Sequence, residues 1–350
     1  MTPDSGRGRD ELFHETRIRA FLEDRGLGHG PLSAERIGEG QSNVTFRVRQ
    51  GDADLVLRRG PKPPLPKSAH DMLREAKLLD ALQQSEVPVP RVLATCDDPS
   101  LLGVPFYVMP FVDGEILTSA EPAGWDDPAV RRSVGEQMVD TLVALHAVPI
   151  DEEPLSGLGR PSGYLERQVR RFASLWEVNS RRDVPLVAEL GERLASHRPA
   201  SQRFSVAHGD YRLGNLMFAR QGAEPPGVVL VLDWEMATLG DPLADVGYLL
   251  ATAAEAGSPA SVMQLSPVSR QPGYLRRDEL AERYSAATGL DLAEISWYQA
   301  LALWKAAIFC EAIYTRWLDG ERPGDTTFAP TLIHGVPELL EQAHDILRGG

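Results

Sequence analysis

The sequence predicts an α+β protein built from two lobes, on three observations. Its 350 residues suit two domains or two lobes by the usual size of a domain. Segments that alternate like β-strands concentrate before about residue 112, with one helical segment among them. Segments with a helical spacing of apolar residues dominate from residue 127 onward. The second part of the chain is therefore expected to be mainly helical.

Composition and charge narrow the class of partner. The formal net charge of -14 argues against a nucleic-acid surface, where clustered basic side chains would be needed, and it permits a cationic substrate without demanding one. Cys96 and Cys310 are too few for a disulfide framework. The N-terminus lacks the apolar core of a signal peptide, and no run of about 18 apolar residues could span a membrane. We expect a cytoplasmic protein without nucleic-acid or membrane partners, of undetermined oligomeric state.

The first strand-like segment forms a candidate phosphate loop. A short amphipathic helix is expected from about residue 10 to 25, and residues 36–48 then alternate like a hairpin. The tip of that hairpin carries Gly38, Gly40, Ser42 and Asn43. Glycine lets backbone N–H groups approach a phosphate closely, although such a turn alone is more often structural. Its position ahead of a strand at 54–58 and a helix at 68–85 favours nucleotide binding.

The stretch from Val206 to Trp234 carries the clearest chemistry. Two strand-like runs, 215–219 and 228–234, flank a polar Gly/Pro loop and predict a hairpin. Antiparallel pairing places Asn215 opposite Leu232 or Asp233, with facing residues roughly 4.5–5.5 Å apart. An amide oxygen beside a carboxylate suits Mg²⁺, which takes few protein ligands and completes its shell with phosphate oxygens and water. Asn215 and Asp233 are therefore the candidate metal ligands.

Asp210 lies five residues before Asn215 in His-Gly-Asp-Tyr-Arg-Leu-Gly-Asn. The protein-kinase catalytic loop has the same spacing, with Arg where this chain has Gly209. Each fragment alone is more often a turn or a cap, but their conjunction resembles the aminoglycoside-phosphotransferase-like kinases, whose signature is His-Gly-Asp-x-x-x-x-Asn followed by a strand ending in Asp. This segment, together with Leu-Val-Leu-Arg-Arg-Gly-Pro earlier in the chain, resembles the sequences of the branch found as the kinase-like part of acyl-CoA dehydrogenase fusion proteins.

This resemblance implies a bilobal protein-kinase-like fold with a small antiparallel sheet and one helix in its first lobe. The nucleotide-binding lobe would cover residues 1–110, with an N-terminal helix, and the helical lobe with the catalytic loop and acceptor site residues 111–350. The nucleotide would be ATP, with GTP possible as a substitute, together with Mg²⁺. Asp210 would orient the acceptor hydroxyl and accept its proton.

The resemblance also assigns nucleotide contacts to the first lobe. The third strand should carry a Lys that pairs with a Glu of the following helix. Glu75 is the candidate Glu, while Arg58 stands where the Lys is expected and offers a planar cationic fork instead. In the segment 105–114, Met109 would border the adenine, the Pro110 carbonyl would accept from its amine, and the Val112 N–H would donate to its ring. An ordinary edge strand closed by an Asp-Gly turn is the alternative.

Later elements are interpreted mainly as structural. Helices are expected at 127–147, 274–288, 295–319 and 336–347, with His146 capping or buried in the first of them and the aromatic residues of the tail chiefly in the core. Asp241 is expected to cap a helix, and Asp241 and Asp245 to brace the catalytic loop. The arginines of the helical region 151–200, including Arg167, Arg170 and Arg171, either meet an anionic acceptor or form a solvated face.

The expected function is an ATP- and Mg²⁺-dependent transfer of the γ-phosphoryl group to a hydroxyl of a small molecule. The family resemblance offers an aminoglycoside-like antibiotic or a hydroxyacyl-CoA-type metabolite as that acceptor. The alternative is a catalytically weak or inactive nucleotide-binding sensor or partner module, which Arg58 in place of Lys supports. Metal-dependent hydrolysis would want more His and carboxylate ligands than this segment offers.

Overall fold

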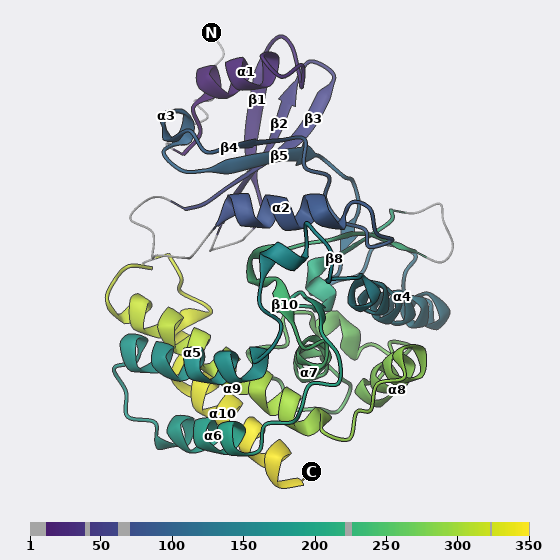
Figure 1. Cartoon of the computed structure of the whole chain (residues 1–350), viewed down its shortest axis with the longest axis vertical. Coiled ribbons are helices and arrows are strands. Elements are labelled where there is room, and N and C mark those ends of the chain that lie inside the picture. Colours follow the sequence, from purple (N-terminus) through teal and green to yellow (C-terminus); the bar gives the residue numbers. More distant parts are fainter. Residues whose placement is uncertain (1–11, 39–42, 62–70, 221–225, 323, 350) are drawn as a thin grey trace. The chain divides into compact units, whose positions relative to one another are not determined.

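The computed structural model describes residues 12–38, 43–61, 71–220, 226–322 and 324–349. The chain divides into two compact units (Figure 1). The N-terminal unit comprises Met1–Gln84 and Val89–Asp113, and the C-terminal unit comprises Ser85–Pro88 and Gly114–Gly350. This division falls after Asp113, three residues beyond the boundary expected from the sequence.

The N-terminal unit contains the expected small antiparallel sheet. Its five strands lie in the order β1-β2-β3-β5-β4, and every pair is antiparallel. The elements are α1 (Glu15–Glu23), β1 (Leu32–Ile37), β2 (Val44–Gln50), β3 (Ala53–Arg59), α2 (Met72–Leu82), β4 (Ala94–Cys96), α3 (Pro99–Leu102) and β5 (Phe106–Pro110). Alternate residues of β2 are buried, and they pack with the apolar face of α1 in one core. The hairpin, both longer helices and the strands predicted from the sequence are thus confirmed.

The helix α2 brings one acidic residue into this unit's interior. It begins after Asp71, whose side chain accepts a hydrogen bond from the Arg74 N–H at 3.0 Å. Its buried face is apolar apart from Glu75, which is 3% exposed. Because a buried carboxylate needs partners, the contacts of Glu75 are described with the candidate site.

The C-terminal unit is mainly helical, as predicted. Its helices are α4 (Pro128–Ala147), α5 (Tyr164–Asn179), α6 (Pro185–Ser196), α7 (Leu243–Thr252), α8 (Arg277–Thr288), α9 (Ile295–Leu318) and α10 (Leu332–Gly349). Two small sheets accompany them, β7 (Ser205–Ala207) with β10 (Thr238–Gly240), and β6 (Glu115–Ile116) with β8 (Leu216–Phe218) and β9 (Val228–Val231). The helix α9 packs against α7 and α10, and α8 packs against α4; Figure 1 labels these helices. Among the described residues, no helix has the length and apolar character needed to cross a membrane.

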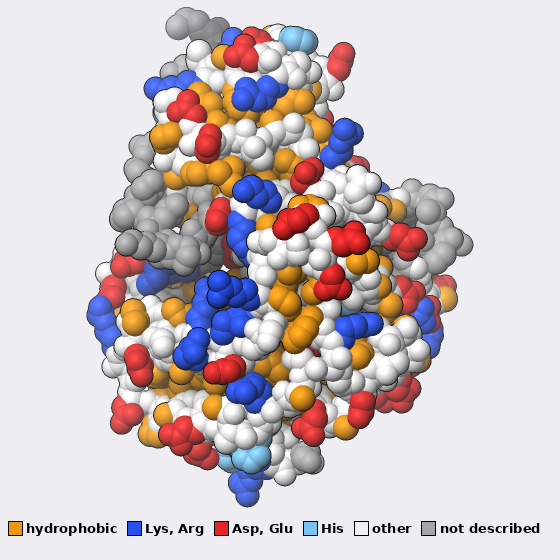
Figure 2. Space-filling view, in the orientation of Figure 1, with side chains coloured by type: hydrophobic (Ala, Val, Ile, Leu, Met, Phe, Trp, Pro, Cys, Tyr) orange, Lys and Arg blue, Asp and Glu red, His pale blue; other side chains and the backbone are white. Residues whose placement is uncertain are grey.

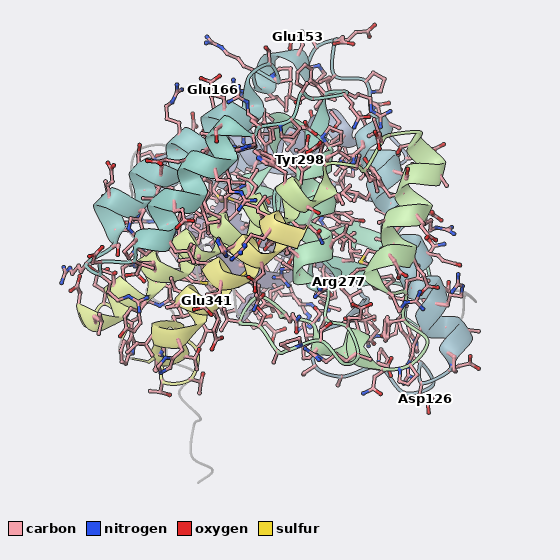
Figure 3. All side chains as sticks on the ribbon, turned by 90° about the horizontal axis from the view of Figure 1, so that it is seen from below. Asp126, Glu153, Glu166, Arg277, Tyr298 and Glu341 are labelled. Carbon is pink, nitrogen blue, oxygen red and sulfur yellow. The ribbon has the colours of Figure 1, made fainter. Side chains whose placement is uncertain are left out.

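The helix α9 forms the centre of this packing. Tyr298 lies inside the helical assembly, whereas Glu166 of α5 and Glu341 of α10 lie on its outside (Figure 3). The indole N–H groups of Trp297 and Trp304 donate to backbone carbonyls of α6, at 3.2 Å and 2.9 Å. These contacts confirm that the aromatic residues of the tail are chiefly core, because buried indole groups need such acceptors.

Gly247 allows α7 and α9 to approach closely. A Cβ atom at this position would lie 2.5 Å from the Cβ of Tyr298 and 2.6 Å from its backbone carbon. We expect Gly247→Ala to lower the free energy of unfolding by about 1–3 kcal/mol, because the two helix backbones would have to separate. Chemical denaturation of the full chain measures this change. Gly349→Ala, at a helical position with open space around it, is the control and should be neutral; equal stability of the two variants would contradict the packing described.

Candidate active site

The catalytic loop starts where β7 ends and requires glycine at its second position. Gly209 has a φ of +86°, and a Cβ atom there would lie 2.9 Å from both the Cβ and the carbonyl oxygen of Met236. A side chain would therefore suffer both backbone strain and steric overlap. This close approach explains physically why glycine stands where protein kinases have arginine.

A buried carboxylate on α7 holds this loop in place. Asp245 accepts hydrogen bonds from the His208 N–H at 2.6 Å and from the Gly209 N–H at 2.8 Å, one on each oxygen. His146 Nε2 lies 3.2 Å from Asp245 Oδ2, and Tyr284 lies 2.7 Å from the other ring nitrogen of His146. Burial alone would raise the pKa of Asp245, but the hydrogen bond and charge of His146, with His208 and the Gly209 N–H, lower it below its ordinary value.

These contacts confirm the bracing role predicted for Asp245 and correct the one predicted for Asp241. Asp241 accepts from the Leu243 N–H at 2.9 Å and from the Tyr298 hydroxyl at 2.9 Å. It therefore satisfies the first turn of α7 and ties that helix to α9, instead of bonding the catalytic loop. The reason is geometric, since Asp245 lies one helical turn further on and occupies the position beside the loop.

The backbone of Leu232 joins the catalytic loop to the predicted metal strand. Its N–H donates to the Asn215 carbonyl at 2.8 Å, and its carbonyl accepts from His208 Nε2 at 2.9 Å. The other ring nitrogen of His208 accepts from the Asp210 N–H at 3.2 Å. Because a backbone N–H can only donate, this bond fixes the proton of His208 on Nε2.

The register of the hairpin brings Asn215 next to Asp233. Leu216 pairs with Val231 and Met217 with Leu230, so Asn215 lies opposite Leu232, as the sequence predicted. Asp233 follows with φ 62° and ψ 66°, and it is the one non-glycine residue of positive φ in the described part of the chain. Strain of this kind concentrates at functional sites, and here the backbone turns sharply where the carboxylate is expected to bind metal.

The side chain of Asp210 is oriented by Asn215 and Arg212. Asn215 Nδ2 donates to its carbonyl oxygen at 2.8 Å and to its Oδ2 at 2.7 Å, while Arg212 Nε lies 3.4 Å from its Oδ1. Burial, followed by the charge and hydrogen bond of Asp210, raises the pKa of Tyr248 well above its ordinary value. The carboxylate remains 22% exposed, so it is both held and accessible.

Sequence reasoning missed Arg212 and Tyr248. Arg212 was visible as a lone basic residue between the two predicted catalytic groups. Tyr248 follows Asp245 by three residues on one predicted helix, and residues three apart share a helix face. These two patterns would have placed the Arg212 and Tyr248 side chains near the predicted catalytic loop, although neither pattern predicts that they lie close to Asp210.

The donor set at the hairpin fits Mg²⁺. Both hydrogens of Asn215 Nδ2 are directed at Asp210, so the amide oxygen is the atom left for a cation. Asp233 adds a carboxylate, and together they supply the few hard oxygen ligands that Mg²⁺ takes from protein when phosphates and water complete its shell. Within the described ranges, no cluster of three or more His, Cys, Asp or Glu side chains could hold a metal by itself. Asn215 and Asp233 therefore suit a metal that arrives with phosphate.

In the N-terminal unit, Arg58 occupies the position expected of the lysine. Its Nε lies 3.1 Å from Glu75 Oε1, and the Tyr107 hydroxyl donates to the same oxygen at 2.9 Å. Both charged side chains are largely buried, at 16% and 4% exposed. The strand-to-helix ion pair of a kinase-like lobe is thus present with arginine as its cation, and a role toward nucleotide stays a prediction.

The other predicted nucleotide contacts lie at strand ends. Gly38 follows β1 and Asn43 precedes β2 as a buried residue, while Gly40 and Ser42 lie outside the described residues. Met109 and Pro110 end β5, and Val112 comes just after it. Among the described residues, the Val112 N–H has no backbone acceptor, whereas the neighbouring Phe111 N–H donates to the Asp54 carbonyl at 2.9 Å. Val112 is therefore available to donate to a ligand.

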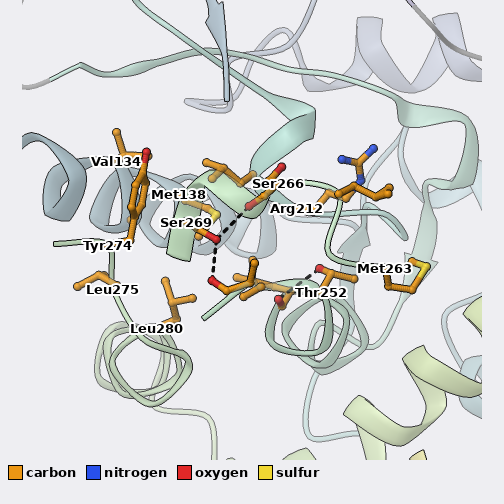
Figure 4. A pocket seen from close by; sticks show the side chains of 16 residues that line it. Val134, Met138, Arg212, Thr252, Met263, Ser266, Ser269, Tyr274, Leu275 and Leu280 are labelled. Carbon is orange, nitrogen blue, oxygen red and sulfur yellow. Dashed lines mark hydrogen bonds between the residues drawn. The ribbon is translucent and has the colours of Figure 1, made fainter. Parts of the chain in front are cut away.

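Two pockets of the C-terminal unit border the catalytic loop. The larger lies among α4, α7 and α8 and reaches Arg212 (Figure 4). Its wall is mainly apolar, and Ser269 turns its hydroxyl to the Ala254 carbonyl at 2.7 Å. The smaller lies between α7 and α9, is open to solvent, and includes Gly209, Tyr248 and Lys305. The smaller pocket thus places a lysine side chain next to the predicted catalytic loop.

The class of protein follows from this fold and from the match of one family. The phosphotransferase enzyme family matches residues 33–298, and the chain belongs to that family. It has the kinase-like bilobal α+β fold of small-molecule phosphotransferases.

The individual relatives named here share a third of their residues with this chain or fewer. The chain is 33% identical over 299 residues to acyl-CoA dehydrogenase family member 10 of Mus musculus, a match that covers 85% of this chain but 28% of that protein. It superposes with a TM-score of 0.79 and 28% identity on a Ralstonia eutropha protein named provisionally as an aminoglycoside phosphotransferase, with 96% and 99% of the two chains covered. Aminoglycoside phosphotransferase APH(4)-Ia in complex with AMP-PNP and hygromycin B gives a TM-score of 0.61 at 16% identity, over 96% and 99% of the chains, which shows the fold alone.

The Asp245 network generates a pH-dependent prediction. We expect Asp245→Asn to destabilise the fold by about 3 kcal/mol at pH 7, because it leaves the buried His146 and two N–H donors poorly matched. A carboxyl whose folded pKa is lowered adds stability above its unfolded pKa, near 3.9, and loses it as the pH falls through the folded value. The difference between the proteins should therefore shrink below about pH 4 in denaturation measured across pH. Asp319→Asn, in an exposed pair with Arg181, should cost less than about 1 kcal/mol. A pH-independent difference would contradict the assignment.

The backbone of Asp233 generates a second prediction. Glycine adopts positive φ without strain, so Asp233→Gly should leave the free energy of unfolding unchanged or raise it by up to about 1 kcal/mol. The same variant should lose the Mg²⁺ dependence of nucleotide binding, because one metal ligand is gone. Thermal melts and nucleotide titrations with and without Mg²⁺ measure the two effects. Asp24→Gly, at a φ of -59°, should be destabilised by about 0.5–1 kcal/mol; an equal loss at Asp233 would rule out strain there.

Proposed function

We propose that this chain transfers the γ-phosphoryl group of ATP to a hydroxyl of a small molecule in a Mg²⁺-dependent reaction. The observation that carries the proposal is the joining of Asp210, Asn215 and Asp233 through the backbone of Leu232. One carboxylate is oriented and accessible, and the two candidate oxygen ligands lie at the same end of the hairpin, Asn215 opposite the residue that precedes Asp233. These are the parts that phosphoryl transfer requires, since positioning and charge neutralisation supply most of its catalysis.

Each residue has a distinct role in this reaction. The Asp210 carboxylate orients the acceptor hydroxyl and takes its proton as the oxygen bonds to the γ-phosphorus. The bond from the γ-phosphorus to the bridging oxygen breaks, and ADP leaves with that electron pair. Asn215 and Arg212 fix the direction of the Asp210 carboxylate. Asn215 and Asp233 would hold Mg²⁺, which when bound neutralises phosphate charge.

The nucleotide contacts are assigned to the N-terminal unit. Arg58, paired with Glu75, would supply a cationic group to the phosphates, and Met109, Pro110 and Val112 would hold the adenine. Gly38, Gly40, Ser42 and Asn43 would line the phosphate loop. A fold relative binds AMP-PNP, which supports ATP as the donor, and GTP remains an alternative nucleotide.

The acceptor belongs to one of two classes. The mouse relative is an acyl-CoA dehydrogenase family member, and that favours a hydroxyacyl-CoA-type metabolite, although the chain spans about a quarter of that protein. An aminoglycoside-like antibiotic is the second class, suggested by fold relatives at low identity. The alternative to catalysis is a nucleotide-binding sensor, which the arginine at position 58 supports.

Asp210→Asn tests the proposal most simply. We expect it to keep Mg·ATP binding while transfer falls by about 10²–10⁴-fold, because the amide cannot take the proton. The assay is a transfer screen with γ-labelled ATP over hydroxyacyl-CoAs, aminoglycosides, amino alcohols and sugars. Asp319→Asn on an exposed helix end is the matched control and should keep full activity. A variant of undiminished rate would remove Asp210 from its role. Transfer to no acceptor, with nucleotide binding that ignores Mg²⁺, would favour the sensor.

A further inference from the structure

The smaller pocket of the C-terminal unit lies directly against the catalytic loop. Gly209, the neighbour of Asp210, forms part of its wall, and Tyr248, whose pKa is raised chiefly by burial and further by the charge of Asp210, forms another part. Its polar lining is completed by Tyr164 from α5, Asp245 from α7, and Tyr298 and Lys305 from α9. A group held in this pocket would therefore lie close to Asp210, whose carboxylate is proposed to orient the acceptor hydroxyl.

Lys305 is unusual in the sequence as well as in the structure. It is the single lysine of residues 114–350, a stretch in which the other permanently charged basic side chains are all arginine. Arginine offers a wide planar fork, whereas lysine places a compact point charge at the end of a narrow stem. A small pocket between two helices accommodates the narrow lysine side chain better than the wide arginine fork, so the residue type matches the site.

The ammonium group of Lys305 is not neutralised by the part of the chain that the structure describes. Its contact there is the ring of Phe172, 4.8 Å from Nζ, with no hydrogen bond or ion pair to a described residue. The carboxylate of Asp245 lines the same pocket, but both of its oxygens accept from His208 and Gly209. Burial lowers the pKa of Lys305 to about 8, with Asp245 and Asp210 opposing that effect and Arg171 adding to it. A largely desolvated cation of this kind is costly unless an anion completes the site.

A second cation lies close by on α5. Arg171 is exposed and has no ion-pair partner among the described residues, and its charge acts on Lys305. Figure 2 shows Lys and Arg side chains gathered on the surface in the region of α5. The sequence left open whether the arginines of this region meet an anionic acceptor, and the proximity of Arg171 to Lys305 favours that interpretation for Arg171.

We propose that the Lys305 pocket binds an anionic group of the acceptor, a carboxylate or a phosphate, and so directs the acceptor hydroxyl to Asp210. This inference rests on the proposed phosphotransferase function and narrows its substrate to hydroxyl compounds that carry a negative charge. Lys305 is then a substrate-positioning residue, with Arg171 attracting the anion at the surface. A polycationic acceptor would meet repulsion at the same place.

Kinetics with matched acceptors test the proposal. Each acceptor is used as a pair, a hydroxy acid with its methyl ester and a sugar phosphate with the free sugar. The wild type should prefer the charged member, and Lys305→Met should raise the KM for that member by about 10-fold or more, the loss of one charge-assisted bond. The KM for Mg·ATP and the kcat should change little. Lys305→Arg should recover part of the preference, and Arg198→Met, which removes an exposed charge elsewhere in the unit, should behave as wild type.

Binding without turnover gives an independent readout. Inorganic phosphate and acetate should each raise the melting temperature of the wild type above that in chloride at equal ionic strength. Lys305→Met should lose part of this rise, and Arg198→Met should keep it. A response to phosphate alone would assign the pocket to phosphate-bearing acceptors, and a response to both anions would assign it to negative charge in general.

The two proposals fail in different ways. If the wild type transfers phosphate but Lys305→Met leaves the KM of charged acceptors unchanged, the pocket assignment is wrong and the phosphotransferase function stands. If no acceptor is phosphorylated, the function is wrong, and the phosphate and acetate titrations still decide on the pocket. An equal anion response in the wild type and Lys305→Met overturns the pocket in either case.

Discussion

The candidate active site depends on one buried carboxylate. Asp245 is removed from water, which by itself disfavours its charge, and this cost is offset by two backbone N–H groups and by His146. The two N–H groups belong to His208 and Gly209, so the compensation also fixes the path of the chain into Asp210. The same hydrogen bonds therefore stabilise the charged Asp245 carboxylate and fix the shape of the loop. They thereby fix the position of the carboxylate proposed to be catalytic.

The backbone of one residue, Leu232, connects this loop to the strand that carries the predicted metal ligand Asp233. The His208 ring donates to the Leu232 carbonyl, and the Leu232 N–H donates to Asn215, so the loop and both strands of the hairpin share one hydrogen-bonded chain. Asp233 then takes a left-handed backbone conformation. The fold accepts this strain at the residue proposed as a metal ligand, and strain of this kind concentrates at functional sites. The charged pocket at Lys305 adds a reason for the acceptor to bind beside the same loop.

Local spacing allowed the sequence to predict much of this site. The strand runs and the Gly/Pro loop between them set the hairpin register, so the pairing of Asn215 with Leu232 could be inferred before any coordinates. The network behind the loop could not, because His146 and Tyr284 are 138 residues apart and nothing in either helix indicates the other. The strand β6 was missed because its two residues are too few to show a period. Lys305 was overlooked for a similar reason, since its helix is apolar on nearly every side and was interpreted as core.

The central claim is that the hairpin forms a metal site beside a separate acceptor carboxylate. A crystal structure of the chain with Mg²⁺ and a non-hydrolysable ATP analogue tests it most directly. The metal should be ligated by the Asn215 amide oxygen, the Asp233 carboxylate and phosphate oxygens, with Asp210 outside its shell and facing the γ-phosphate. A metal bound elsewhere in the chain, or one held by Asp210 in place of Asp233, would contradict the assignment of roles.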